Sequence, residues 1–159
     1  MSRPRVDLIA PPFRGHLHPM IGLGRALADV ADVRVLTGTA LVPEITASGL
    51  PARGLLAGAE ATIAAIADPP RRVGANPLRL AAQFRATLDL LERMQAELNA
   101  LWAAERPTLV IADSVLPVAG AVAQPRGLPW WTSTVSPCVI ESRNGPPAYL
   151  GGWAPRADA

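Results

Sequence analysis

The residues best suited to chemistry lie near the amino terminus, in the run Gly15-His16-Leu17-His18. An imidazole has an ordinary pKa of ~6.5, so a histidine can accept a proton at neutral pH. His16 comes directly after a glycine that follows an apolar segment, and we interpret it as a candidate general base. A metal site is a weaker interpretation, because the chain has 2 His and 1 Cys to act as ligands. A purely structural turn is the other alternative, and it suits His18 better than His16.

A carboxylate that can partner this base occurs much further along the chain. Asp113 ends the apolar run 109–112 and precedes Ser114. An aspartate in this position is typical of a helix N-cap. It can also accept the Nδ1–H of His16, which would fix the tautomer of that ring. The two roles are compatible in one side chain.

These residues require a framework of strands and helices to bring them together. The apolar runs 6–10, 33–37, 109–112 and 128–132 are typical of buried strands, and apolar residues at helical spacing follow Pro19 and Pro77. Such alternation predicts an α/β fold, with a Rossmann-like parallel sheet and helices on both faces. Ligands bind at the carboxyl ends of the strands in such sheets. We therefore expect His16, Asp113 and Thr132 at one edge.

Several local features refine this framework. A helix is expected to begin at Pro19, where proline suits the first position, and Gly22 and Gly24 would let it sit close to the sheet. Asn76 is expected to cap the helix that begins at Pro77. A short helix over 41–48 and a short strand over 52–56 are expected between them. Of the adjacent Trp130 and Trp131, at least one should be buried and the other is free to line a pocket.

Composition excludes several classes of function. All 15 basic residues of this 159-residue chain are Arg, which argues against a P-loop, a protein kinase and a Schiff-base enzyme, since each needs a Lys. Gly22-Leu-Gly24-Arg-Ala-Leu27 lacks the third glycine of a dinucleotide fingerprint.

The Arg residues form no basic stripe for nucleic acid, and no apolar run reaches the ~18–20 residues of a membrane span. With no signal segment, the chain is expected to be cytoplasmic, and Cys138 to be inert.

Three motifs in order carry a resemblance to a known family. Pro-Pro-Phe-Arg-Gly-His-Leu-His-Pro over 11–19, Leu-Val-Ile-Ala-Asp over 109–113 and Gly-Leu-Pro-Trp-Trp-Thr over 127–132 resemble segments of nucleotide-sugar-dependent glycosyltransferases of the GT-B fold. The likeness is to the amino-terminal half of enzymes that glycosylate macrolides and other natural products.

The resemblance implies an inverting sugar transfer to a hydroxyl of a small apolar acceptor, with no metal and no other cofactor. It implies that His16 is the general base and that Asp113 orients it. The remaining assignments are Arg14, Gly15 and Thr132 for the donor sugar or substrate, and Phe13, Phe84 and Trp131 for the acceptor pocket. The region between about Leu55 and Trp102 is expected to shape that pocket.

The sequence departs from the family pattern in two respects. His18 stands where many relatives carry a small polar residue such as Asn. The chain also lacks a second half, so residues 1–159 are expected to be the acceptor-binding domain, with the carboxy-terminal domain that binds the nucleotide-sugar absent. Two alternatives stay open: a non-catalytic binding or auxiliary module that lacks a donor site, and another reaction on the same architecture, as in lipid-linked precursor glycosyltransferases and sugar epimerases.

Overall fold

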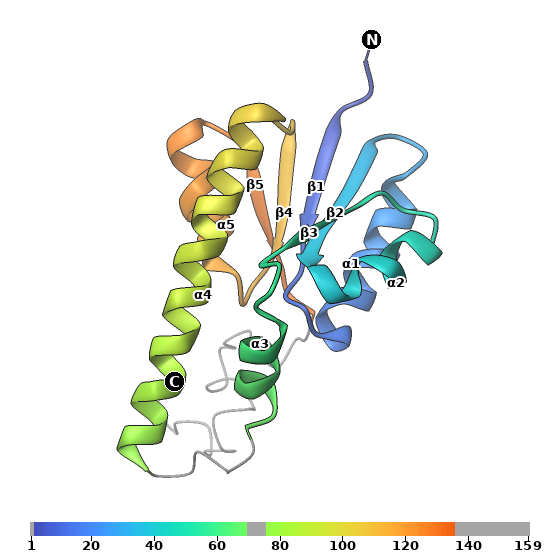
Figure 1. Ribbon diagram of the computed structural model, residues 1–159. Coiled ribbons are helices and arrows are strands. Elements are labelled where there is room, and N and C mark those ends of the chain that lie inside the picture. The colour runs from blue at the N-terminus through green and yellow to red at the C-terminus, as the bar shows by residue number, and fades with distance from the viewer. Residues whose placement is uncertain (1, 70–75, 136–159) are drawn as a thin grey trace, which may run out of the picture.

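The computed structural model describes residues 2–69 and 76–135, which form a five-stranded parallel sheet flanked by helices (Figure 1). The strand order is β3-β2-β1-β4-β5, which confirms the expected α/β architecture. The strands are β1 (Arg5–Ile9), β2 (Asp32–Gly38), β3 (Ala52–Leu55), β4 (Leu109–Asp113) and β5 (Trp130–Ser133). The helices are α1 (Arg14–Leu27), α2 (Val42–Ala47), α3 (Glu60–Ala67), α4 (Pro77–Ala104) and α5 (Pro117–Ala123), with short 3₁₀ turns η1 (Thr39–Leu41) and η2 (Gln124–Arg126).

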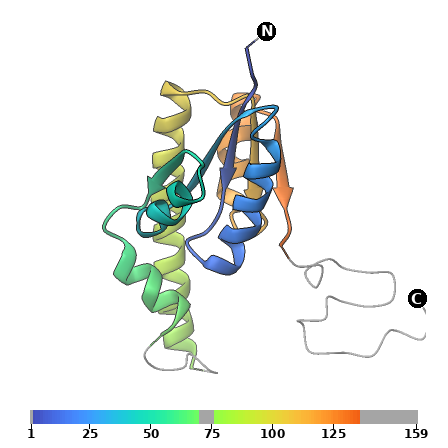
Figure 2. The same ribbon diagram turned by 90° about the vertical axis from the view of Figure 1, so that its right-hand side faces the viewer.

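Helices cover both faces of the sheet, as expected (Figures 1 and 2). Side chains alternate along a strand, so the neighbours Leu8 and Ile9 of β1 enter opposite cores, and both are fully buried. Leu8 packs in the core that α1 and α2 cover, together with Leu17 and Val35. Ile9 packs in the core beneath α4 and α5. The continuous apolar runs of β1, β2 and β4 thus reflect strands that are buried on both faces.

Helix α1 begins earlier than the sequence predicts. It starts at Arg14, and Pro19, the expected first residue, lies inside it. The Phe13 carbonyl accepts the N–H groups of His16 and Leu17 at 3.0 and 2.9 Å, which closes a helical turn before the proline is reached. Proline lacks the N–H that would bond the carbonyl four residues earlier, so the helix forgoes one bond there. His16 therefore lies in the first turn of a helix and not in a loop.

Of Gly22 and Gly24 in α1, only Gly24 is needed for close packing. A Cβ on Gly24 would lie 2.8 Å from Leu50 Cδ1 and 3.2 Å from Leu8 Cδ1, so a side chain there would collide with the core. A Cβ on Gly22 would meet no atom within 4 Å. The prediction is confirmed for Gly24 and is wrong for Gly22, which lies away from the sheet.

The two tryptophans of β5 are both partly exposed. Trp130 lies against α5, where a Cβ on Gly120 would come within 2.7 Å of its ring. Even so, 38% of Trp130 and 65% of Trp131 are exposed. The expectation that at least one is buried is wrong, because β5 is an edge strand of the described sheet and nothing described covers its outer side.

A buried ion pair ties the end of α4 to the sheet. Asp7 on β1 is fully buried and accepts hydrogen bonds from Arg34 of β2 at 3.1 and 2.9 Å. The indole N–H of Trp102 donates to the same carboxylate at 2.9 Å. Burial alone lowers the pKa of the Arg34 guanidinium, but its bonds to Asp7 and Glu105 outweigh this and raise the pKa above its ordinary value.

Helix α4 is far longer than the strands beside it. Its 28 residues span about 42 Å at ~1.5 Å each, whereas a five-residue strand covers roughly 17 Å. As predicted, Asn76 caps it, accepting from Leu78 N and Arg79 N at 3.1 Å. The buried residues of the helix all fall between Met94 and Trp102. Its amino-terminal half therefore extends past the carboxyl ends of the strands, beside α3 (Figure 1).

Candidate functional site

His16 and Asp113 meet at the carboxyl edge of the sheet, although 97 residues separate them. The first turn of α1 carries His16, and the last residue of β4 is Asp113. Their Nδ1 and Oδ2 atoms lie 2.9 Å apart. Strand β4 pairs with β1, and α1 follows β1 directly, so the sheet register sets this distance. The predicted proximity of the two residues is confirmed.

The Asp113 carboxylate is held from both sides. Its side chain is completely buried, and its Oδ1 accepts the Val115 N–H at 3.0 Å while Oδ2 faces His16. A buried carboxylate is an acceptor only, so Nδ1 of His16 is assigned as the protonated nitrogen. The His16 side chain is 28% exposed, and its Nε2 has no hydrogen bond to a described residue. The unprotonated Nε2 can therefore accept a proton from a bound molecule.

A second acidic residue braces the same helical turn from the other side. Glu44 of α2 accepts hydrogen bonds from Arg14, at 3.1 Å, and from His18. These bonds hold the pKa of Glu44 below its ordinary value of 4.5. Neither Arg14 nor His18 forms a hydrogen bond or ion pair with Asp113, so the two histidines have separate carboxylate partners. Sequence reasoning missed Glu44, because no local pattern shows that α2 lies against the start of α1.

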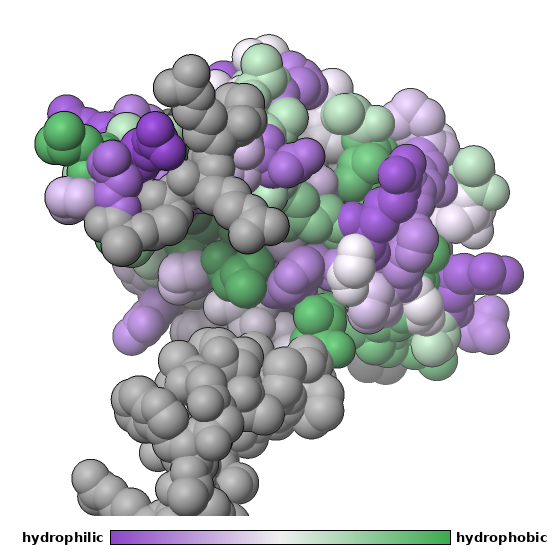
Figure 3. Space-filling view, turned by 90° about the horizontal axis from the view of Figure 1, so that it is seen from below, coloured by the Kyte–Doolittle hydropathy of each residue, from purple (hydrophilic) through white to green (hydrophobic). Residues whose placement is uncertain are grey.

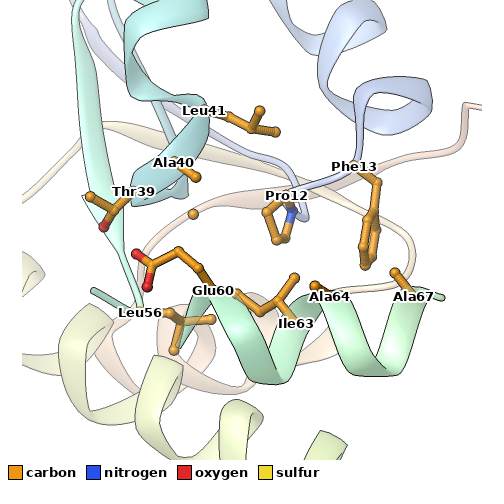
Figure 4. Close-up of a pocket in the computed structure, with 11 residues that line it drawn as sticks. Pro12, Phe13, Thr39, Ala40, Leu41, Leu56, Glu60, Ile63, Ala64 and Ala67 are labelled. Atoms are coloured by element: carbon orange, nitrogen blue, oxygen red, sulfur yellow. The ribbon is translucent and has the colours of Figure 1, made fainter. Parts of the chain in front are cut away.

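An apolar hollow, here called the Glu60 hollow, opens beside this turn (Figure 4). It encloses about 240 Å³ between α3 and the segment after β1. Figure 4 shows the Glu60 carboxylate at one end, near Thr39, and the Phe13 ring at the other, above Ala67. Its lining residues are Pro12, Phe13, Gly38, Thr39, Ala40, Leu41, Leu56, Glu60, Ile63, Ala64 and Ala67.

A second hollow, here called the Met94 hollow, lies between α3 and α4 and also encloses about 240 Å³. Pro12, Phe13, Leu56 and Ile63 line both hollows. Seen from the carboxyl ends of the strands, apolar residues gather between hydrophilic ones on this face (Figure 3). The other residues of the Met94 hollow are Pro11, Ile66, Thr87, Leu90, Leu91, Met94, Val115 and Leu116.

Phe13 links the hollows to the histidine. Its ring meets His16 edge-on, with 6.4 Å between the ring centroids. Apolar space therefore lies next to a histidine that is oriented by a buried carboxylate. Much of the Met94 hollow comes from the expected region between Leu55 and Trp102. The sequence did not predict α3. None of its residues is fully buried, so the helix has no distinct buried face that a pattern of apolar residues could indicate.

Other predicted site residues lie apart from these hollows. Phe84 on α4 is 61% exposed and Trp131 on β5 is 65% exposed, and neither lines a hollow described above. Placing them in the acceptor pocket therefore has no support in the geometry.

Thr132 pairs with Ala112, and strand alternation puts its side chain on the opposite face of the sheet from Asp113. Gly15 has open space around it, and the roles of Gly15, Arg14 and Thr132 stay predictions. Cys138 falls outside the described residues.

Neither a metal-binding cluster nor a helix able to span a membrane occurs in the part of the chain that the structure describes. Within residues 2–69 and 76–135, no group of three or more His, Cys, Asp or Glu side chains could hold a metal ion. The same ranges contain no helix long and apolar enough to cross a membrane. The expectation of a reaction without metal stays a prediction.

Solved structures of glycosyltransferases match this fold. The glycosyltransferase of kitacinnamycin matches with a TM-score of 0.66 and 20% identity over 86% of this chain. CalG4, the calicheamicin glycosyltransferase, matches with a TM-score of 0.66 and 17% identity over 84%. The chain has the fold of the amino-terminal part of GT-B glycosyltransferases. SsfS6 from Streptomyces sp. SF2575 is 25% identical over 83% of this chain, with a TM-score of 0.62.

The chain spans about a third of the length of these GT-B enzymes: 31% of the kitacinnamycin enzyme, 33% of CalG4 and 39% of SsfS6. No protein-family model matches the sequence, and no curated protein matches it.

Proposed function

We propose that this chain is the acceptor-binding domain of an inverting glycosyltransferase, which transfers a sugar from a nucleotide-sugar to a hydroxyl of a small apolar acceptor. The observation that carries the proposal is the His16–Asp113 pair, 2.9 Å apart, at the edge of apolar hollows. The pair occurs on a fold shared with enzymes that glycosylate natural products. No other described pair combines an oriented histidine with adjacent apolar space.

In this proposal His16 is the general base. An acceptor hydroxyl hydrogen-bonds to Nε2 and loses its proton as its oxygen attacks the anomeric carbon of the sugar. The buried Asp113 carboxylate holds Nδ1–H in place and stabilises the imidazolium that forms. A positioned base of this kind contributes about 10²–10⁴-fold to such a step. Direct attack from the face opposite the leaving nucleoside diphosphate inverts the anomeric centre.

The acceptor is proposed to occupy both hollows. Each encloses about 240 Å³, whereas pockets for drug-sized ligands usually span ~300–1,000 Å³. A molecule of that size needs both hollows. It can extend from one to the other, because the two adjoin at Pro12, Phe13, Leu56 and Ile63, which line both. Because Phe13 adjoins His16, such a molecule would present a hydroxyl close to Nε2. The apolar lining favours an apolar acceptor.

The nucleotide-sugar is proposed to bind in a part of the enzyme that this chain does not include. SsfS6 was solved with thymidine diphosphate, and VinC with dTDP. Both neighbours are more than twice as long as the segment that this chain matches, since it covers 38% and 35% of them. The chain by itself is therefore expected to bind the acceptor and to need a donor-binding domain for transfer.

The test uses the complete enzyme, in which this domain is joined to a donor-binding domain. Sugar transfer and donor binding are measured in the His16→Ala variant. We expect transfer to fall about 10²–10⁴-fold, with donor affinity unchanged. His18→Ala is the matched control, because it removes the other histidine, which pairs with Glu44 and not with Asp113. Undiminished transfer in His16→Ala would refute the base role. Absence of transfer in the wild-type enzyme, with acceptor binding retained, would favour a non-catalytic binding module.

A further inference from the structure

The Glu60 hollow carries a charge that an apolar acceptor by itself does not require. Ten of its eleven lining residues are uncharged, and Glu60 is the exception. The side chain extends from the start of α3 into the space between Thr39 and Leu56 (Figure 4). A carboxylate at the end of an apolar hollow can orient a bound molecule. It favours binding of a hydrogen-bond donor at that end and disfavours binding of an acceptor.

The Glu60 carboxylate is only partly used by the protein. Its Oε1 accepts the Gly58 N–H at 3.2 Å. Among the described residues no ion pair is formed by Glu60, and its Oε2 accepts no hydrogen bond from any of them. The nearest comparison is Glu44, whose two oxygens are occupied by Arg14 and His18. Glu60 therefore keeps one charged acceptor atom available to a ligand.

No cationic side chain among the described residues lines either hollow. Arg14, at the start of α1, is committed to Glu44. Two other carboxylates lie close to the hollows: Asp113, through its contact with His16, and Glu44, whose charge is offset by Arg14. The local field is therefore negative, although the formal net charge of the chain is +2. A preference for cations in this hollow would arise from Glu60 and not from the charge of the whole protein.

We propose that the acceptor carries a basic amine, and that Glu60 binds its ammonium group and selects it against neutral and anionic analogues. This inference rests on the proposed acceptor-binding function. The ammonium would lie at the Glu60 end of its hollow and the apolar body across Ile63 in the Met94 hollow. Phe13 stands at the junction of the two, so the reacting hydroxyl lies near the middle of the molecule, within reach of His16.

Three probes with one ring system separate charge from apolar burial: naphthylethylamine, naphthylethanol and naphthylacetate. Their affinities for the full chain are measured by titration calorimetry at low salt. An ammonium–carboxylate hydrogen bond in a partly open site is expected to favour the amine over the alcohol roughly 5- to 10-fold. The acetate should bind more weakly than the alcohol, against the direction of the net charge.

The Glu60→Gln variant decides the assignment. Glutamine keeps a side-chain oxygen for the Gly58 N–H, so the start of α3 is preserved, and only the charge is lost. We expect the amine preference to disappear while the affinity for naphthylethanol is retained. Glu92→Gln is the matched control, since Glu92 is exposed on α4 and lines neither hollow; it should behave as the wild type.

Two results would overturn the inference in distinguishable ways. Equal binding of amine and alcohol to the wild type, or an amine preference that survives in Glu60→Gln, would remove the role of Glu60 and leave the acceptor hollow intact. Failure of all three probes to bind would overturn the proposed acceptor site together with this inference.

Discussion

Replacing Asp113 with asparagine should invert the tautomer of His16. In the wild type, Oδ1 of Asp113 accepts the Val115 N–H at 3.0 Å and Oδ2 accepts Nδ1–H of His16 at 2.9 Å. An asparagine has one oxygen and one NH₂ group. Because the backbone N–H of Val115 is fixed, the amide oxygen must face it, and the NH₂ group then faces His16. Nδ1 becomes an acceptor, and the proton moves to Nε2.

The size of the effect follows from the hydrogen bonds. A hydrogen bond to a charged partner stabilises by ~1.5–3 kcal/mol, which at ~1.36 kcal/mol for each tenfold favours the Nδ1–H tautomer of wild-type His16 roughly 10- to 150-fold. The neutral bond from asparagine contributes ~0.5–1.5 kcal/mol, so Asp113→Asn should favour Nε2–H about 2- to 10-fold. A histidine protonated at Nε2 cannot act as the base there. In the complete enzyme this shift of tautomer by itself should lower sugar transfer about 3- to 11-fold. The loss of the carboxylate that stabilises the imidazolium should lower transfer further.

Long-range ¹⁵N spectra of the chain at about pH 9, well above the ordinary histidine pKa of ~6.5, report each tautomer directly. The chain has 2 His, so the spectrum is simple. His18 serves as an internal reference, because its Nε2 faces Glu44 and should carry the proton. Glu44→Gln is the matched control, since it should affect His18 and leave His16 unchanged. A wild-type His16 protonated at Nε2, or an Asp113→Asn variant that retains Nδ1–H, would refute the reasoning.

Three further predictions concern stability, each measured by urea unfolding of the chain. Thr37→Val should raise the free energy of unfolding by about 1 kcal/mol, because the buried Thr37 hydroxyl has no described partner; a loss of stability would show that the hydroxyl is bonded. Arg34→Met should lower it by ~3–5 kcal/mol by leaving the Asp7 charge buried and unpaired, and adding Asp7→Asn should restore part of the loss, whereas a double variant no better than the single one would argue against a buried charge. Glu44 has a lowered pKa in the folded state because of His18 and Arg14, so its stabilisation is present above its ordinary value of 4.5 and is lost as the pH falls through the lowered pKa. The difference in stability between wild type and Glu44→Gln should therefore shrink on acidification, and a constant difference would contradict this.

Much of the framework could be predicted because its signals are local. The strand β4 ends at Asp113 because the apolar run 109–112 ends there, and Asn76 with Pro77 marks the start of α4 by capping chemistry alone. The pairing of His16 with Asp113 could also be predicted, since the alternation of strands and helices implies a parallel sheet whose carboxyl ends share one edge.

The start of α1 shows where a local rule misleads. Proline at 19 is a favourable first residue of a helix, yet the Phe13 carbonyl closes a turn five residues earlier. The turn is held by groups that are remote in sequence, because Asp113 and Glu44 bind His16, Arg14 and His18 from β4 and α2. Such contacts outweigh the single hydrogen bond that Pro19 cannot make.

The sequence by itself determined the parallel sheet, the order of its main elements and the candidate pair His16 and Asp113. Only the tertiary structure decided where the hollows lie. The hollows depend on the overhang of α4 past the sheet and on the placement of α3 beside it, which are distances between elements and leave no periodic trace in the chain. For the same reason the sequence could not show that Ile63 and Leu91 line the Met94 hollow, or that Phe84 and Trp131 line neither hollow.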